Sequence, residues 1–212
     1  MQRDCADTKD SVQHRIKRIR MVSKGNNMFQ QKVKADAEAI INLLGFVPKE
    51  LEELRKEMES CVDYQMEEYE DWDEDLQKYV TKIWRPTVDT TIIDDMLDVF
   101  YTSIVGRIFS MAEDGLKVLS GITGKPNTPK GIPAMSDLDL YYQEIINKKA
   151  LSLPSIEVLW PDKSNFHRLR KEITHKGKCH LSESEIKTLI PNIENVLKML
   201  LSIEEQIRTT KL

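Results

Sequence analysis

The sequence predicts an all-α protein, built as a helical bundle with an N-terminal helical extension that contains a long acidic helix. Three observations predict this class. Charged residues make up 31% of the chain and apolar residues 40%, with only 8 Gly and 8 Pro, a mixture typical of charged helical proteins. Apolar residues recur at spacings of three and four over most of the chain. No alternating pattern typical of strands extends beyond a few residues.

The length and the cysteines of the chain indicate how many domains to expect and in which compartment the protein works. A chain of 212 residues can hold one large or two small domains. It contains no apolar run long enough to cross a bilayer, and the polar start Met1-Gln-Arg-Asp-Cys5 does not resemble a secretory signal. The 3 cysteines are odd in number and widely spaced, which argues against a disulfide framework. We therefore expect a cytoplasmic protein without a membrane partner.

Charge is distributed unevenly along the chain. The net charge is −4, which argues against unselective coating of nucleic acid. Residues 1–35 and 163–178 are nevertheless basic, whereas residues 49–75 are strongly acidic. A local basic segment of this kind can still hold a phosphate backbone.

Two helices are expected near the start of the chain, over residues 8–23 and 28–44. Gly45 stands where a C-cap would end the second helix, and Pro48 is suited to opening the next element. The apolar residues that define the two helical faces are Val12, Ile16, Ile19 and Val22, followed by Val33, Ala37, Ile40 and Leu44.

Residues 49–83 are expected to form one long acidic helix, as part of a helical hairpin or a short coiled coil. Its acidic run Glu67–Asp75 is interpreted as a solvated face, or alternatively as a surface that repels nucleic acid or docks a basic partner. Arg85-Pro86 marks the expected end of the extension, which therefore covers residues 1–85. The heptad-like positions are Leu51, Leu54, Met58 and Cys61, then Tyr69, Trp72, Leu76, Tyr79 and Ile83.

The second domain is expected over residues 88–212. Asp89-Thr90-Thr91 can cap an apolar helix over about 92–119, whose apolar residues cover most of its circumference. Such a helix should lie at the centre of a bundle. A loop rich in Gly and Pro follows, and Ser136-x-x-Asp139 restarts a helix over about 137–148.

The last two helices enclose the most distinctive segment of the chain. Asp162 can cap the first of them, which ends in Arg168-Leu-Arg-Lys-Glu-Ile-Thr-His175-Lys-Gly177. Ser182-x-x-Glu185 forms a capping box that opens the final helix, reaching about Arg208. Pro191 lies inside the final helix and is expected to kink it.

The order of helix, Arg170, four residues, His175, glycine turn and capped amphipathic helix resembles the R-x(4–6)-H motif of the HEPN ribonuclease family (higher eukaryotes and prokaryotes nucleotide-binding domain). The resemblance covers roughly residues 88–212, whose helices look like the four helices of that domain. Two positions depart from the family pattern. Lys171 stands where many members have Asn, and Gly177 stands where members silenced by tyrosine modification have Tyr.

The resemblance implies a metal-independent endoribonuclease that acts as a toxin or defence effector. Arg170 and His175 would be catalytic, with His175 transferring a proton and Arg170 steadying the phosphate charge. Arg168, Lys171 and Lys176 would contact RNA phosphates. The resemblance implies no metal or other cofactor.

Partners follow from the same resemblance. RNA is the implied substrate, and a homodimer would bring two motifs together across an interface. Residues 1–85 would be available to an antitoxin or a sensor protein.

The choice between the two arginines depends on the helix. Arg168 and His175 share a face if the helix is unbroken, whereas Arg170 can turn inward if the helix frays near His175. We assign Arg170 because the four-residue spacing is the commoner form in the family.

Other interpretations of the segment remain open. Arg170 and His175 can be a basic helix end that complements the helix dipole. The fold can bind RNA or nucleotide, or another protein, without cleaving RNA. His175, Cys179 and His180 suggest a metal site, but their spacing matches no closed zinc pattern and no fourth ligand is evident.

Overall fold

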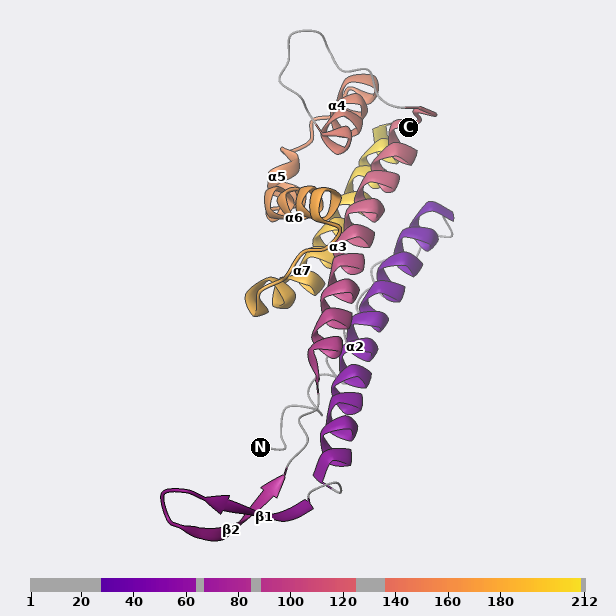
Figure 1. Cartoon of the computed structure of the whole chain (residues 1–212). Coiled ribbons are helices and arrows are strands. Elements are labelled where there is room, and N and C mark those ends of the chain that lie inside the picture. Colours follow the sequence, from indigo (N-terminus) through magenta and orange to yellow (C-terminus); the bar gives the residue numbers. More distant parts are fainter. Residues whose placement is uncertain (1–27, 64–66, 85–88, 125–135, 211–212) are drawn as a thin grey trace. The chain divides into compact units, whose positions relative to one another are not determined.

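The structure, a computed structural model, describes residues 28–63, 67–84, 89–124 and 136–210 (Figure 1). Within these residues it is a helical bundle with one minor two-stranded hairpin, which confirms the all-α class expected from the sequence. The expected helix over 8–23 and the boundary at Arg85-Pro86 lie outside the described residues. The elements in chain order are α2 (Met28–Asp63), β1 (Glu67–Asp73), β2 (Lys78–Trp84), α3 (Thr91–Ser120), α4 (Asp137–Lys149), α5 (Ile156–Leu159), α6 (Lys163–Lys176) and α7 (Glu183–Thr210).

Helix α2 is longer than the sequence indicated. It is a single helix of 36 residues, with Pro48 inside it, so the expected break at Gly45 is wrong. Proline removes one backbone N–H from the ladder and costs about 3 kcal/mol in a helix interior. Burial of Val33, Ala37 and Ile40 before Pro48, and of Leu51 after it, offsets that cost.

The second half of the expected helix over 49–83 is also wrong, because residues after Asp63 form an antiparallel hairpin. Strand β2 reads KYVTKIW, and its β-branched and aromatic residues favour strands. The turn is fixed by the Asp73 carboxylate, whose Oδ1 accepts hydrogen bonds from the N–H groups of Asp75 and Leu76, each at 3.0 Å. Gln77 completes the turn with a φ of 49°.

The chain divides into two compact units. Of the described residues, one unit contains 28–45 together with those from Asp98 onward, and the other contains those between Phe46 and Leu97. In the second unit Arg55 pairs with Asp94, which joins α2 to the start of α3.

The helices of the C-terminal half follow the sequence closely. Helix α3 begins one residue before the expected start and ends one residue after the expected end. Helix α4 has the expected cap, because Ser136 Oγ accepts a hydrogen bond from the Asp139 N–H at 3.3 Å. Helix α7 continues through Pro191 to Thr210. The short helix α5 was not expected from the sequence.

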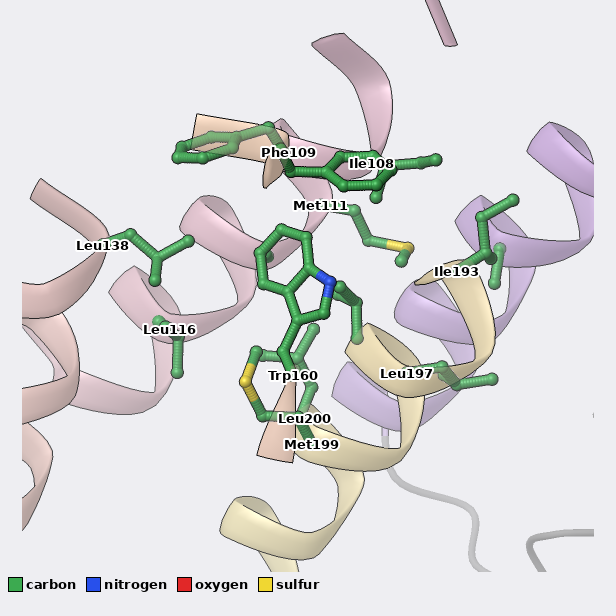
Figure 2. Close-up of a cluster of buried hydrophobic side chains, with 14 of the residues drawn as sticks. Ile108, Phe109, Met111, Leu116, Leu138, Trp160, Ile193, Leu197, Met199 and Leu200 are labelled. Atoms are coloured by element: carbon green, nitrogen blue, oxygen red, sulfur yellow. The ribbon is translucent and has the colours of Figure 1, made fainter. Parts of the chain in front are cut away.

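Trp160 stands at the centre of the core of the larger unit (Figure 2). Its side chain has no exposed surface, and its Nε1–H donates to Asn192 Oδ1 at 2.7 Å. Apolar side chains of several helices surround the indole, including Phe109, Leu116, Leu138, Leu197 and Leu200. Packing in this core holds α3, α4, α6 and α7 together. It therefore fixes the position of α6, which carries Arg170 and His175.

None of the helices in the described ranges combines the length and the apolar content needed to cross a membrane.

Candidate functional site

Helix α6 is anchored by one apolar face and ended by a glycine. Phe166 and Leu169 are each 1% exposed, and Ile173 packs against the same core. Their spacings of three and four residues keep these side chains on one face. Gly177 ends the helix with a φ of 77°, in the left-handed region that glycine adopts at little cost, and its N–H donates to Ile173 O at 2.8 Å. The polar residues of the motif therefore lie on the outward faces of a well-anchored helix.

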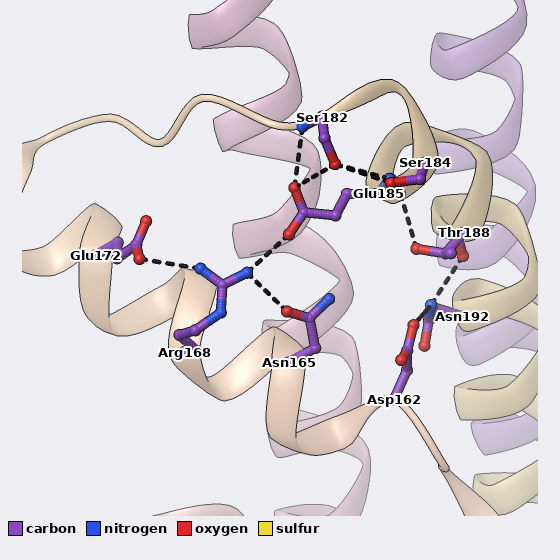
Figure 3. A network of polar contacts seen from close by, with 9 residues as sticks. All are labelled: Asp162, Asn165, Arg168, Glu172, Ser182, Ser184, Glu185, Thr188 and Asn192. Atoms are coloured by element: carbon purple, nitrogen blue, oxygen red, sulfur yellow. Dashed lines mark hydrogen bonds and ion pairs between the residues drawn. The ribbon is translucent and has the colours of Figure 1, made fainter.

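Arg168 connects α6 to the start of α7 (Figure 3). Its Nη1 donates to Glu172 Oε1 at 3.0 Å, and its Nη2 donates to Asn165 Oδ1 at 2.8 Å and to Glu185 Oε1 at 2.7 Å. Both terminal nitrogens are therefore occupied by acceptors from its own chain. This arrangement gives Arg168 a role in holding α6 and α7 together.

Glu185, which accepts a hydrogen bond from Arg168, also forms the cap at the start of α7. Its Oε2 accepts hydrogen bonds from the Ser182 N–H at 2.9 Å and from the Ser182 hydroxyl at 2.8 Å, and the Glu185 N–H donates to Ser182 Oγ at 3.3 Å. This reciprocal pattern is the capping box that the sequence indicated. The hydrogen bond from the Ser182 backbone is the largest cause that lowers the pKa of the Glu185 carboxyl, and Arg168 adds to it.

Arg170 points to a different neighbour, the central helix α3. Its guanidinium lies 4.2 Å from the centre of the Phe109 ring, within cation–π range. Its Nη1 also donates to Glu113 Oε2 at 2.9 Å. The side chain remains 45% exposed. Arg170 is thus held in place by two partners on α3 while part of its guanidinium faces solvent.

His175 lies in the last turn of α6 and is exposed. Within the described residues, its ring makes no hydrogen bond or ion pair. Helix α6 continues through Lys176, so the fraying that would let Arg170 turn toward His175 does not occur. At 3.6 residues per turn, Arg170 and His175 are about 140° apart around the helix, whereas Arg168 and His175 are only about 20° apart.

The two lysines expected to contact RNA are both exposed. Lys171 follows Arg168 by three residues and precedes His175 by four, so these three side chains lie along one face of α6. Lys176 lies beside His175 at the end of the helix. Basic side chains therefore line the face of α6 that carries the exposed imidazole of His175. Arg168, one of these side chains, is paired with carboxylates.

The segment after α6 is fixed to α3 by hydrogen bonds. Thr102 Oγ1 accepts from the Cys179 N–H at 3.1 Å, and Cys179 is buried. Burial is the main cause that raises the pKa of its thiol. His180 Nδ1 lies 2.9 Å from Asp98 Oδ1. Across the described ranges, no three His, Cys, Asp or Glu side chains are grouped in a way that could hold a metal ion.

The structure brings only part of the expected site together within one chain. Arg168 and Lys171 share a face with His175, whereas Arg170 is directed toward α3. Sequence reasoning did not identify Phe109 and Glu113 as partners of Arg170. The sequence does show that Phe109 and Glu113 are four residues apart and so share a face of the helix expected to be central. A side chain from a neighbouring helix can contact both residues on such a face.

Comparisons of the chain with protein-family models, with curated proteins and with solved structures found no match.

Proposed function

We propose that the chain is a metal-independent endoribonuclease of HEPN type, acting on cellular RNA as a toxin or defence effector. The observation that carries the proposal is the exposed imidazole of His175, at the end of a well-anchored helix, with no hydrogen bond to any described residue. An imidazole left accessible in this way can give or take a proton when RNA binds. The nearby Lys171 and Lys176 supply positive charge for the phosphate backbone.

Arg170 is the better suited of the two arginines to act on the phosphate. A guanidinium has five N–H donors, and Arg170 uses one of its terminal nitrogens for Glu113. The Phe109 ring holds the planar group in a fixed orientation, which favours recognition of phosphate oxygens. Arg168 has both terminal nitrogens occupied, so we assign it to positioning α7 instead.

The proposal requires two copies of the chain. Because Arg170 and His175 lie on different sides of one unbroken helix, a single α6 does not direct both side chains at one phosphate. In a homodimer with facing motifs, one copy can supply Arg170 while the other supplies His175. Two copies also supply two imidazoles, one to act as base and one to act as acid.

The reaction follows from these groups. One His175 imidazole removes the proton of the ribose 2′-OH, and the 2′-oxygen forms a bond to the adjacent phosphorus. The bond from phosphorus to the 5′-oxygen breaks, and the leaving oxygen takes a proton from the second His175. Arg170 offsets the negative charge that develops on the phosphoryl oxygens. The products are a 2′,3′-cyclic phosphate and a free 5′-hydroxyl, and DNA is not cleaved because it lacks the 2′-OH.

The test is RNA cleavage in EDTA by the wild-type chain, by His175→Ala and by His167→Ala. His167 is a second exposed histidine on α6, and its ring lies 6.3 Å from that of Phe109, so its variant controls both for the loss of an imidazole from this helix and for a change beside Phe109. We expect cleavage with a cyclic phosphate end for the wild type and for His167→Ala, and none for His175→Ala. Equal activity of all three proteins, or cleavage of the DNA version of the substrate, would contradict the proposal.

A second function is favoured by the carboxylates around the motif. Glu172 and Glu185 pair with Arg168, and Glu113 pairs with Arg170, which offsets positive charge where RNA would bind. A non-catalytic helical module that binds RNA, nucleotide or protein needs no free arginine. Binding of RNA by both the wild type and His175→Ala, without cleavage by either, would support this alternative.

A further inference from the structure

The β1–β2 hairpin exposes large apolar side chains. Trp72 is 48% exposed, Leu76 58% and Tyr79 67%. A two-stranded hairpin is at best marginally stable by itself in water, because it has no face to bury. Clustered apolar side chains that remain exposed are typical of interaction sites. The hairpin therefore has the properties of a surface that another molecule covers.

Trp72 and Tyr79 form an ordered aromatic pair on one face, whereas Tyr69, which is 45% exposed, lies on the opposite face. Trp72 stands directly opposite Tyr79 in the strand register. Their ring centres are 5.2 Å apart with an angle of 70° between the planes, an edge-to-face arrangement. Because side chains alternate along a strand, Glu70 and Thr81 lie on the same face. The paired rings thus present a firm platform with a carboxylate beside it.

Negative charge is in excess around this platform. Residues 67–84 contain seven Asp or Glu and two Lys. Asp71 pairs with Lys82 at 2.6 Å, so one of the two positive charges is already neutralised on the opposite face. Glu70, Glu74 and Asp75 make no ion pair with any described residue. The aromatic face and the adjoining turn therefore carry carboxylates that have no positive partner within the described part of the chain.

This charge decides what can cover the hairpin. Exposed aromatic rings can stack nucleic-acid bases, but the surplus carboxylates repel the phosphate backbone that must accompany the bases. The same repulsion disfavours anionic lipid and the acidic hairpin of a second copy. A positively charged protein segment has complementary charge. Its Lys or Arg side chains can also pack their stems on the rings and hold their charge over the ring faces.

We propose that the Trp72–Tyr79 face of the hairpin docks a lysine- and arginine-rich segment of another protein. The rings contact the cationic side chains, and Glu70, Glu74 and Asp75 pair with the remaining positive charges. This site is independent of the proposed ribonuclease activity, since none of its residues belongs to α6.

The test uses the full chain and a fluorescein-labelled peptide in which Lys and Arg alternate with Thr. Fluorescence anisotropy measures binding at low and at high salt. We expect binding that weakens as salt rises, because exposed ion pairs are screened. A peptide with Glu in place of every Lys and Arg should not bind. Because α6 is proposed to bind and cleave RNA, the RNA arm uses the His175→Ala chain, in which Trp72→Ala and Tyr79→Ala should leave the binding of a labelled single-stranded RNA unchanged.

Two sets of variants separate the rings from the charges. Trp72→Ala and Tyr79→Ala should each weaken peptide binding by about 2- to 5-fold, the loss expected for one exposed cation–π contact. Trp72→Phe should retain most of the affinity, because an aromatic face remains. Glu74→Gln combined with Asp75→Asn should weaken binding and reduce its salt dependence without touching the aromatic pair. Val158→Ala, which removes an exposed apolar side chain elsewhere, is the control and should bind like the wild type.

The proposal is overturned if the basic peptide does not bind, if the aromatic and charge variants bind it as the wild type does, or if the aromatic variants weaken the binding of RNA as much as the binding of the peptide. Peptide binding by His175→Ala should equal that of the wild type. Loss of ribonuclease activity and loss of hairpin docking can therefore be told apart.

Discussion

The Arg170 guanidinium lies 4.2 Å from the centre of the Phe109 ring, and its Nη1 donates to Glu113 at 2.9 Å. Phe109 and Glu113 are one helical turn apart on α3, so they hold the arginine from two sides. The arginine that we propose to be catalytic is therefore also a contact between α6 and the central helix. Changes at Arg170 should affect stability and activity by different amounts.

We expect Arg170→Ala to lower the free energy of unfolding by about 0.5–1 kcal/mol, the value of an exposed cation–π contact. The exposed ion pair with Glu113 adds little to this figure. RNA cleavage should be lost almost completely, because the charge that steadies the phosphate is removed. Urea unfolding and the EDTA cleavage assay measure the two effects.

Arg170→Lys is the matched variant. It keeps the positive charge but loses the planar group that stacks on Phe109, so it should recover only part of the cleavage activity. Wild-type cleavage by Arg170→Ala would show that this arginine takes no part in the reaction.

The capping box of α7, and with it the contact between α6 and α7, should weaken in acid. The Ser182 backbone N–H and Arg168 lower the pKa of Glu185 in the folded chain. A depressed carboxyl pKa contributes stability that is fully present above the unfolded value of about 4.3. That contribution is lost as the pH falls from there through the lower folded pKa. Unfolding free energies measured at neutral pH and in acid should show this loss.

Glu185→Gln is the control for this titration. Glutamine can still complete a capping box but carries no charge. The variant should be less stable than the wild type at neutral pH, and the difference should shrink in acid. A difference that stays constant with pH would mean that another carboxyl group causes the loss.

The regular parts of the fold could be predicted because their signals are local. Ser182 and Glu185 are three residues apart, and the capping box they form is visible in the sequence and present in the structure. Arg170 and Phe109 are separated by 61 residues, and no local pattern indicates that they meet. No local pattern indicates which residues of a second copy would face His175 either, so the homodimer stays a prediction.

The sequence did not predict the hairpin, because a separation of seven residues suits both a helix and a hairpin. Trp72 and Tyr79 are seven residues apart, which suits the same face of a heptad helix. The same separation places them opposite each other across the turn between β1 and β2. The aspartate at position 73, whose side chain fixes the turn, and the β-branched residues of β2 were the signals that could have decided between them.

Trp160→Phe should destabilise the core by about 1–3 kcal/mol, the cost of leaving a buried polar group unsatisfied. The indole N–H donates to Asn192 Oδ1 at 2.7 Å, and both side chains are buried. Phenylalanine fills most of the volume but offers no donor. Chemical unfolding gives the measurement. Asn192→Leu should cost at least as much, because it also removes the hydrogen bonds that Asn192 Nδ2 donates to Asp162 Oδ2 and to Thr188 O, each at 2.8 Å.

Two glycines of α3 should respond to alanine in opposite directions. A Cβ built at Gly115 would lie 2.5 Å from Leu200 Cδ1 and 2.7 Å from Cδ2, whereas one at Gly106 meets nothing within 4 Å. Alanine is favoured over glycine in a helix by about 0.5–1 kcal/mol, so Gly106→Ala should stabilise the chain by that amount. The same gain applies at Gly115, but there it is opposed by overpacking.

Overpacking should win at Gly115. Leu200 has no exposed surface, so its side chain can move away only by displacing other core residues. Such overpacking costs about 1–3 kcal/mol, which exceeds the helix gain over most of that range. Urea unfolding of both variants should therefore place Gly115→Ala below the wild type and Gly106→Ala above it. The difference in unfolding free energy between the two variants gives the steric cost, because both gain equally from replacing glycine by alanine in a helix. Equal stability of the two variants would mean that α3 and α7 pack less closely at Leu200 than the structure indicates.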